Sequence, residues 1–154
     1  MTIEELREEI SIELEYMGAT VKESVELLHD FSVKHPAIRE KTAAAAFLAQ
    51  FYGGIENILK RIHRYHEIPL PTGDSWHLEI FRRFCNPPFS PFPVIFDDSL
   101  ATDLLPFRKF RHVVHHGYGF QLDWDRMKEG LEKVNYVNSR FVSSISNYLT
   151  KLSV

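Results

Sequence analysis

The sequence predicts an all-α fold, on the evidence of helical periodicity, helix-capping residues and the near absence of strand-like alternation. Apolar residues recur at three-, four- and seven-residue steps along most of the chain, which is the spacing of one buried helix face. The chain has 154 residues, 44% of them hydrophobic, which suits one continuous core and is too short for two domains. We therefore expect a single domain over residues 1–154, built as an up-down bundle of four to five helices.

Two long helices are expected first, separated by a proline. Thr2 and Glu5 form a capping-box pattern. The helix that follows should end near Pro36, because the residue before a proline leaves the α region, and the second helix should begin at Pro36 itself. Gly53 and Gly54, in the middle of the second helix, predict that another backbone packs closely against it.

A short helix over WHLEIFRRF should come next, followed by a proline-rich loop. The stretch NPPFSPFPVIF holds four prolines in eleven residues, which is too many for a helix. Its phenylalanines, Phe89, Phe92 and Phe96, are too apolar for a free linker. We expect an ordered loop that packs on the helical bundle. Its exposed aromatic rings would need a surface to pack against.

The last two helices should be marked by aspartates. Asp97 or Asp98 is a candidate cap for a short turn, and Asp103 for a longer helix with Pro106 in its first turn. This helix should end at Gly117, a suitable C-terminal residue. Asp123 should then cap the final helix.

Composition excludes several classes of protein. Charged residues make up 25% of the chain and the net charge is −3. A strongly cationic protein that coats nucleic acid and a chain with a disordered acidic tail are therefore both excluded. The single cysteine, Cys85, excludes a disulfide framework and fits a reducing compartment. The first residues lack the basic and apolar regions of a signal peptide, and no apolar run approaches the roughly 20 residues of a membrane span. We expect a cytoplasmic protein that does not enter the membrane.

Residues 107–120, FRKFRHVVHHGYGF, carry the most cationic helix side in the sequence. Arg108, Arg111, His112 and His115 crowd a polar side beside an apolar one, although an ordinary solvated face would have a similar composition. RNA can be cleaved without a metal ion when one group takes the 2′-hydroxyl proton, another stabilises charge on the phosphate, and the leaving 5′-oxygen is protonated. Imidazole and guanidinium groups suit these tasks.

The order of residues in this segment resembles a known family. Arg111, His116 and Tyr118 spell R-x4-H-x-Y at the end of a late helix. With the YGGIENILKRI run at 52–62, the FRHVVHHGYGFQLDW block at 110–124, the long first helix and the length, this resembles the HEPN superfamily, and within it the HepT-like ribonuclease toxins paired with minimal nucleotidyltransferase antitoxins. The resemblance implies a HEPN-like helical bundle with the proline-rich loop before the motif helix. It also implies a metal-independent endoribonuclease toxin of a type II or type VII-like toxin–antitoxin system.

The resemblance and the basic segment together give each candidate residue a role. Arg111 and His116 are the expected catalytic residues, and Tyr118 is the residue to which the antitoxin would attach AMP. The expected supporting or RNA-binding residues are Arg108, His112, His115, Glu56 and Lys60. Glu56 lies at the margin of the apolar face, where it could be a surface ion-pair member or could orient Arg111. No cofactor is expected.

Helix geometry predicts a homodimer. Residues 111 and 116 lie about 140° apart on an ideal helix, so an intact helix does not aim both side chains at one phosphate. Either His116 turns back where the helix ends at Gly117, or a two-fold dimer places this segment from both chains around one cleft, as the family resemblance implies. If both are surface sites, truncation of Arg111 or His116 should change the free energy of unfolding by no more than about 0.5 kcal/mol.

Three further patterns leave alternatives open. His112 and His116 at i, i+4, with His115 nearby, could grip a metal ion, but no carboxylate or cysteine at ligand spacing completes the set, so no metal is expected. A second basic cluster has a solvated helix end as its first interpretation and RNA-backbone binding as its second; its members are Lys60, Arg61, His63, Arg64 and His66. Many relatives carry Asn or Asp where this chain has His112, so the alternative function is a catalytically inactive HEPN-type module that binds RNA, a nucleotide or a nucleotidyltransferase partner.

Overall fold

The computed structural model describes residues 1–117 and 123–152, and these ranges contain helices and loops but no strand. The helices are α1 (Ile3–Asp30), α2 (Ile38–Tyr65), α3 (Trp76–Arg82), α4 (Asp98–His116) and α5 (Trp124–Leu152). The predicted all-α, HEPN-like bundle is confirmed. None of the described helices is both long enough and apolar enough to cross a membrane.

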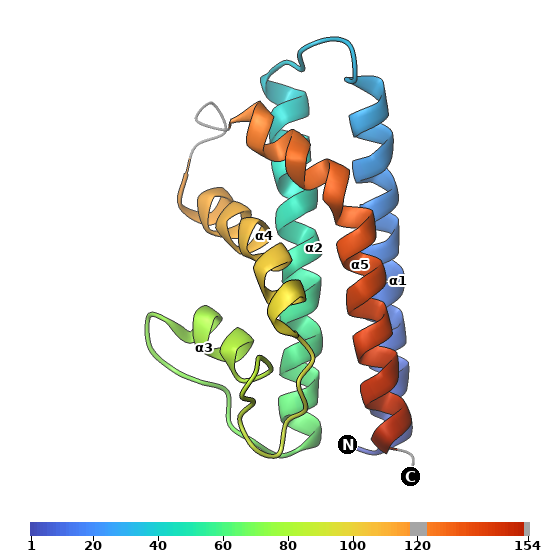
Figure 1. The fold of residues 1–154 in the computed structure, drawn as a ribbon, viewed down its shortest axis with the longest axis vertical. Helices are drawn as coiled ribbons and strands as arrows, with labels where there is room; N and C mark the ends of the chain where they lie inside the picture. The colour runs from blue at the N-terminus through green and yellow to red at the C-terminus, as the bar shows by residue number, and fades with distance from the viewer. Residues whose placement is uncertain (118–122, 153–154) are drawn as a thin grey trace.

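The long helices alternate in direction along the long axis of the molecule (Figure 1). Helices α1 and α2 lie side by side, α5 packs against both, and α4 lies obliquely against α2. The short helix α3 and the proline-rich loop lie beside the end of α2 where that helix finishes. Helix α2 is therefore the central element, and a polar side chain on it can be enclosed by α3 and α4.

The start of α1 is confirmed, but the predicted boundary at the first proline is wrong. The Thr2 N–H donates to Glu5 Oε2 at 2.7 Å and the Glu5 N–H donates to Thr2 Oγ1 at 3.1 Å. Helix α1 ends at Asp30 and α2 begins at Ile38, not near and at Pro36. Val33 is 94% exposed, so the apolar face that would hold a longer helix in place has already ended.

The paired glycines of α2 do accommodate close neighbours, but these are side chains and not a backbone. A Cβ atom on Gly54 would overlap with Cγ of Met17, and one on Gly53 would lie 3.1 Å from Nη1 of Arg111. The predicted close approach of another backbone is therefore wrong. Gly53 instead leaves room for a guanidinium group.

Helix α4 starts earlier than predicted and contains Pro106 in its interior. Asp97 is the N-cap, because its Oδ1 accepts the Leu100 N–H at 2.8 Å. The predicted separate turn and the later start at Asp103 are wrong. An interior proline costs about 3 kcal/mol. The earlier start gains the Asp97 cap and places Leu100 on the same buried stripe as Leu104 and Phe107, and these gains offset the cost of the proline.

The beginning of α4 is tied to α5 by Arg140. Its guanidinium donates to both carboxylate oxygens of Asp97 at 3.1 and 3.2 Å, and to Asp103 at 3.2 Å. Hydrogen bonding from the Leu100 N–H and the charge of Arg140 together lower the pKa of Asp97. At the start of α5, the Asp125 N–H donates to Asp123 Oδ1 at 3.0 Å, as expected if Asp123 caps this helix.

The proline-rich loop packs on the body as predicted. Phe92 and Phe96 are buried in the core, whereas Phe89 is 44% exposed. The Phe84 carbonyl accepts hydrogen bonds from the N–H groups of Ile95 and Phe96 at 2.9 and 3.1 Å. The expectation that all three rings need a further surface is wrong, because two of them are covered by this chain itself.

Candidate active site

Arg111 is the motif residue that the fold holds most firmly. It extends from α4 onto α2, where its Nε lies 2.5 Å from Oε1 of Glu56. The Glu56 side chain is 1% exposed and the Arg111 side chain 25%. The interpretation of Glu56 as a surface ion-pair member is therefore wrong, and its other predicted position, beside Arg111, is the one observed.

Gly53 leaves room for the Arg111 side chain beside this ion pair. It precedes Glu56 by three residues on α2, so the two share a helix face, and Nη1 of Arg111 lies close to Gly53 while Nε pairs with the carboxylate. A Cβ atom at residue 53 would lie 3.1 Å from Nη1, so a side chain there would crowd the guanidinium. The two glycines of the sequence thus have different neighbours, and one of these neighbours is the motif arginine.

The same buried carboxylate has a second partner, His77 of α3. Nδ1 of His77 lies 2.6 Å from Oε2 of Glu56, and the imidazole is 47% exposed. A carboxylate can only accept a hydrogen bond, so Nδ1 of His77 carries the proton. His77 could not be identified from the sequence, because a single histidine on a seven-residue helix has no motif and no spacing to distinguish it from a surface residue.

Side chains of α2, α3 and α4 line a cleft of about 610 Å³. Six of the predicted site residues line this cleft: Glu56, Arg108, Arg111, His112, His115 and His116. His77 and Tyr52 line it as well. Burial raises the pKa of the Tyr52 hydroxyl, and the charge of Glu56 adds to the effect, so this phenol stays protonated. The cleft therefore combines imidazoles and guanidinium groups around one buried carboxylate.

The histidines of α4 remain on a regular helix up to its end. The tilted rings of His112 and His116 have their centroids 4.6 Å apart, and α4 continues through His116, so His116 does not turn back. The helix ends at Gly117 as predicted, but with extended backbone (φ −106°, ψ 177°) and not in the left-handed conformation. Glycine is needed for space, because a Cβ atom there would lie 2.6 Å from the Val113 carbonyl oxygen.

A family model described as HepT-like protein matches residues 43–152. The chain belongs to the HepT-like family. The matched residues include all of α3, α4 and α5 and most of α2, so they cover Glu56, His77 and Arg111. Searches of curated proteins and of solved structures gave no match. The family resemblance expected from the sequence is confirmed.

Of the other two predicted site residues of this HepT-like chain, one does not line the cleft and one falls outside the described residues. Lys60 projects from α2 over the Trp76 ring, with Nζ 4.8 Å from the ring centroid, which is a cation–π contact. Tyr118 lies outside the described residues. Arg108 does line the cleft, with its guanidinium 5.1 Å from the Phe81 ring centroid, and among the described residues it has no carboxylate partner.

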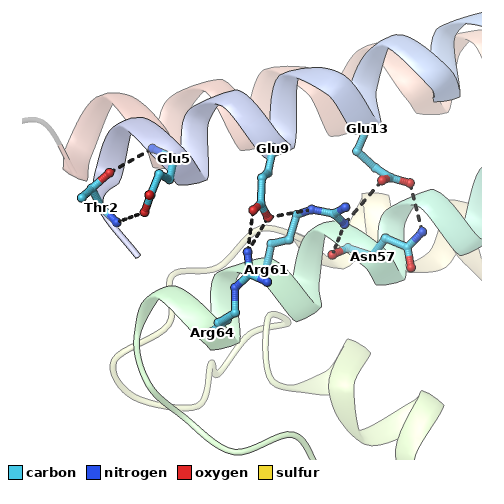
Figure 2. A network of polar contacts seen from close by, with 7 residues as sticks. All are labelled: Thr2, Glu5, Glu9, Glu13, Asn57, Arg61 and Arg64. Carbon is cyan, nitrogen blue, oxygen red and sulfur yellow. Dashed lines mark hydrogen bonds and ion pairs between the residues drawn. The ribbon is translucent and has the colours of Figure 1, made fainter.

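The second basic cluster of the HepT-like chain is neutralised by α1. Figure 2 shows Arg61 and Arg64 reaching from α2 to Glu9 and Glu13. Arg64 Nη2 lies 2.6 Å from both carboxylate oxygens of Glu9. Arg61 lies 3.2 Å from Glu9 and 3.4 Å from Glu13. The alternative role of this cluster in binding an RNA backbone thus loses the support of its two arginines.

The histidines of that cluster are buried or half-buried, contrary to the first interpretation of the sequence. His63 is 1% exposed. Its Nδ1 donates to the Leu59 carbonyl at 2.8 Å, and its Nε2 lies 3.2 Å from Nη1 of Arg83. His66, which is half-buried, pairs through Nε2 with the Tyr148 hydroxyl at 2.7 Å. Both rings pack against Phe92 of the proline-rich loop, and His63 also packs against Phe84.

The metal alternative has one structural test. In residues 1–117 and 123–152, no group of three or more His, Cys, Asp or Glu side chains is arranged to hold a metal ion. The rings of His112 and His116 lie beside each other at an interplanar angle of 48°.

Proposed function

We propose that this HepT-like chain is a metal-independent endoribonuclease and the toxin of a type II or type VII-like toxin–antitoxin pair. The observation that carries the proposal is the Arg111 guanidinium, held by the buried carboxylate of Glu56 at a cleft lined by imidazoles and a second arginine. A fixed guanidinium fork binds a phosphate through two parallel hydrogen bonds. A cleft of this composition suits a phosphodiester better than an uncharged ligand.

In this proposal Arg111 neutralises the charge that develops on the phosphate oxygens. Its ion pair with Glu56 uses Nε, and among the described residues no carboxylate pairs with its Nη groups, which are left for the substrate. His116 transfers a proton during cleavage. Arg108, His112 and His115, which line the same cleft, bind the RNA backbone on either side of the scissile phosphate.

The active form in this proposal is a homodimer. Helix α4 keeps its regular geometry up to His116, so the angle of about 140° between residues 111 and 116 on an ideal helix applies to this chain. A two-fold axis beside the end of α4 would bring the same segment of a second chain to the cleft. Sedimentation of the chain without an antitoxin at micromolar concentration tests this, since a monomer would contradict it.

The cleavage reaction is tested with purified protein and a labelled RNA in the presence of EDTA. The parent should cleave, Arg111→Lys and His116→Gln should not, and Arg64→Ala should behave as the parent because Arg64 belongs to the neutralised cluster. Induction in cells should stop growth for the parent and for Arg64→Ala only. Cleavage that EDTA abolishes would contradict a metal-independent mechanism.

The alternative is a catalytically inactive module that binds RNA, a nucleotide or a nucleotidyltransferase. The observation that favours it is the exposed ring of His112, which stands where many relatives carry Asn or Asp. The two functions differ in the same assay, because an inactive module would bind labelled RNA and leave it intact. A His112→Asn variant that gains cleavage would identify the ring as the cause.

Control of the toxin is proposed to come from a small nucleotidyltransferase that attaches AMP to Tyr118. The added phosphodiester would bring negative charge to a cleft whose cations otherwise receive RNA. Mass spectrometry of the chain co-expressed with a nucleotidyltransferase encoded beside it should find one AMP on Tyr118. An unmodified tyrosine in a fully neutralised complex would leave simple occlusion of the cleft as the mechanism.

A further inference from the structure

RNA cleavage through the 2′-oxygen needs two proton transfers, one from the attacking hydroxyl and one to the leaving oxygen. The motif supplies one histidine, His116, for this pair of tasks. We propose that His77 is the general base that takes the 2′-hydroxyl proton, with Glu56 as its positioning residue. The inference rests on the ribonuclease activity proposed above.

The contact with Glu56 fixes which nitrogen of His77 faces the substrate. Nδ1 donates to Oε2 of Glu56 at 2.6 Å, so the neutral ring carries its lone pair on Nε2. In the described part of the chain, no hydrogen bond uses that Nε2. The ring is 47% exposed and lines the same cleft as Arg111 and His116. A base needs this combination of a fixed tautomer and an accessible lone pair.

The surroundings of His77 also restrict the plane of its ring. The Trp76 ring lies against it, with centroids 3.5 Å apart and an interplanar angle of 31°. Lys60 covers Trp76 in turn, and Ile80 and Phe81 of the same helix are buried in the core. Lys60, which was expected to bind RNA, thus supports the base through Trp76. A side chain held in this way loses little conformational freedom when substrate arrives.

Both proton transfers of the proposed cleavage use histidine side chains of the protein. Nε2 of His77 takes the 2′-hydroxyl proton as the 2′-oxygen forms a bond to phosphorus, and the bond from phosphorus to the 5′-oxygen breaks. The 5′-oxygen takes a proton from the imidazolium of His116 of the second chain in the proposed homodimer. The products are a 2′,3′-cyclic phosphate and a free 5′-hydroxyl group, and water returns the two histidines to their starting states.

Glu56 links this step to phosphate binding. Before proton transfer its carboxylate balances the charge of Arg111, while the neutral His77 ring donates a hydrogen bond to it. After transfer two cations share the one buried carboxylate, and a positive charge has appeared in the cleft as negative charge develops on the phosphate. This is the order of events that stabilises the transition state.

The test is the pH dependence of single-turnover cleavage of an RNA oligonucleotide in EDTA, for the parent and three variants. His77→Asn keeps an N–H donor near the position of Nδ1 but cannot take a proton, and His116→Gln removes the acid. Both should lose about 10²–10⁴-fold in rate. His77→Asn should also lose the rise in rate with increasing pH, and His116→Gln the fall at higher pH. His29→Asn, an exposed histidine of α1, is the matched control and should follow the parent.

A second substrate separates the two roles. In an RNA with sulfur in place of the bridging 5′-oxygen, the leaving thiolate needs no proton. This substrate should restore cleavage by His116→Gln and leave His77→Asn inactive.

The outcomes separate this inference from the proposed function. A His77→Asn variant with the parental rate and pH profile, or one rescued by the sulfur substrate, would overturn the assignment of His77 while the ribonuclease stands. A parent that cleaves neither substrate would overturn the proposed ribonuclease and this inference with it.

Discussion

Two basic clusters of this chain look alike in the sequence and differ in the structure. In the cluster at the end of α2, Arg61 and Arg64 are paired with glutamates of α1 (Figure 2). In the cluster at the end of α4, Arg111 has a buried carboxylate partner, whereas Arg108 has none among the described residues. The α2 cluster joins two helices, and the α4 cluster leaves positive charge along a cleft.

The difference lies in the helix that each cluster faces. Helix α1 presents Glu9 and Glu13, one turn apart, to the arginines of α2. Helix α4 faces a part of α2 where a glycine and one enclosed glutamate take the place of surface carboxylates. A count of basic residues along the sequence therefore cannot locate a binding surface, because the acidic partners are contributed by another segment. Matched substitutions in the two clusters test this difference directly.

The largest expected effect is on cleavage by Arg111→Lys. The ammonium group can still neutralise Glu56 but cannot present a planar fork to the phosphate, so the rate should fall by about 10²–10³-fold, as when a transition-state donor is lost. Single-turnover cleavage of a labelled RNA measures it.

Lysine is the informative replacement because Arg111→Ala would leave Glu56 buried with one partner fewer. That orphaned charge should cost about 1–3 kcal/mol of stability, more than the 0.5 kcal/mol expected of a surface site. Arg61→Lys, in the neutralised cluster, is the matched control. Equal rates for Arg111→Lys and the parent would mean that the fork does not contact the phosphate.

The next largest effect should come from Glu56→Gln. The amide keeps the shape of the side chain but removes its charge and leaves one acceptor oxygen in place of two, so it cannot serve both Arg111 and His77, and cleavage should fall by about 10–100-fold. Glu9→Gln makes the same chemical change in the other cluster and should leave cleavage unchanged, with a stability loss within about 1 kcal/mol. The same loss of activity in both variants would remove the distinction between the clusters.

A smaller effect is expected on the salt dependence of RNA binding. If Arg108 contacts one phosphate, Arg108→Ala should reduce the slope of log affinity against log salt by about 0.7–0.9. Arg64→Ala should leave the slope as it is, because Glu9 already occupies that guanidinium. Fluorescence anisotropy with a non-cleavable 2′-deoxy oligonucleotide gives both slopes. An Arg64→Ala slope that changes as much as that of Arg108→Ala would show that the α1 glutamates do not prevent RNA contact.

The smallest expected effect is on the pH dependence of the free energy of unfolding. Burial lowers the pKa of His63 below its ordinary value of 6.5, so the folded state holds a neutral ring and the unfolded chain takes up the proton first. The contribution of the neutral His63 ring to the free energy of unfolding is therefore fully present above about pH 6.5. It decreases as the pH falls below that value, by at most about 1.4 kcal/mol per pH unit for one proton. Urea unfolding between about pH 5 and 7.5 should show a shallower slope for His63→Gln than for the parent.

His66, whose pKa burial also lowers, should account for part of the slope that remains. His29→Gln is the matched control, since that ring is exposed at the end of α1. An unchanged slope in His63→Gln would mean that the buried ring is not the group that takes up the proton.

Local signals predicted much of the fold. The capping box of Thr2 and Glu5, the end of α4 at Gly117 and the aspartate before α5 are each visible in a few consecutive residues. The start of α4 was not predictable in this way, because Pro106 argues locally for a later start. Only the burial of a stripe of three side chains in the assembled core outweighs it.

The residues of the candidate site show the same distinction between local signals and contacts in the folded chain. Arg111 and His116 were located from a short motif, and the structure puts both beside one cleft. The burial of Glu56 and the presence of His77 were not predictable, because their contact joins residues 21 apart on helices whose mutual placement no local pattern encodes. The sequence therefore predicted the residues of one helix, and the contacts between three helices required the structure.

The short helix α3 determines how the cleft unfolds on heating. Its seven residues are far fewer than the roughly 12–15 that an isolated helix needs in water, and among the described side chains none caps its N-terminus. Its hold on the bundle comes from two buried residues, Ile80 and Phe81, and from the contact of His77 with Glu56. Local opening of α3 therefore costs less than unfolding of the bundle. Hydrogen exchange should be faster at the amides of α3 than in the middle of α2, and cleavage should decline at a temperature where the four long helices are still intact.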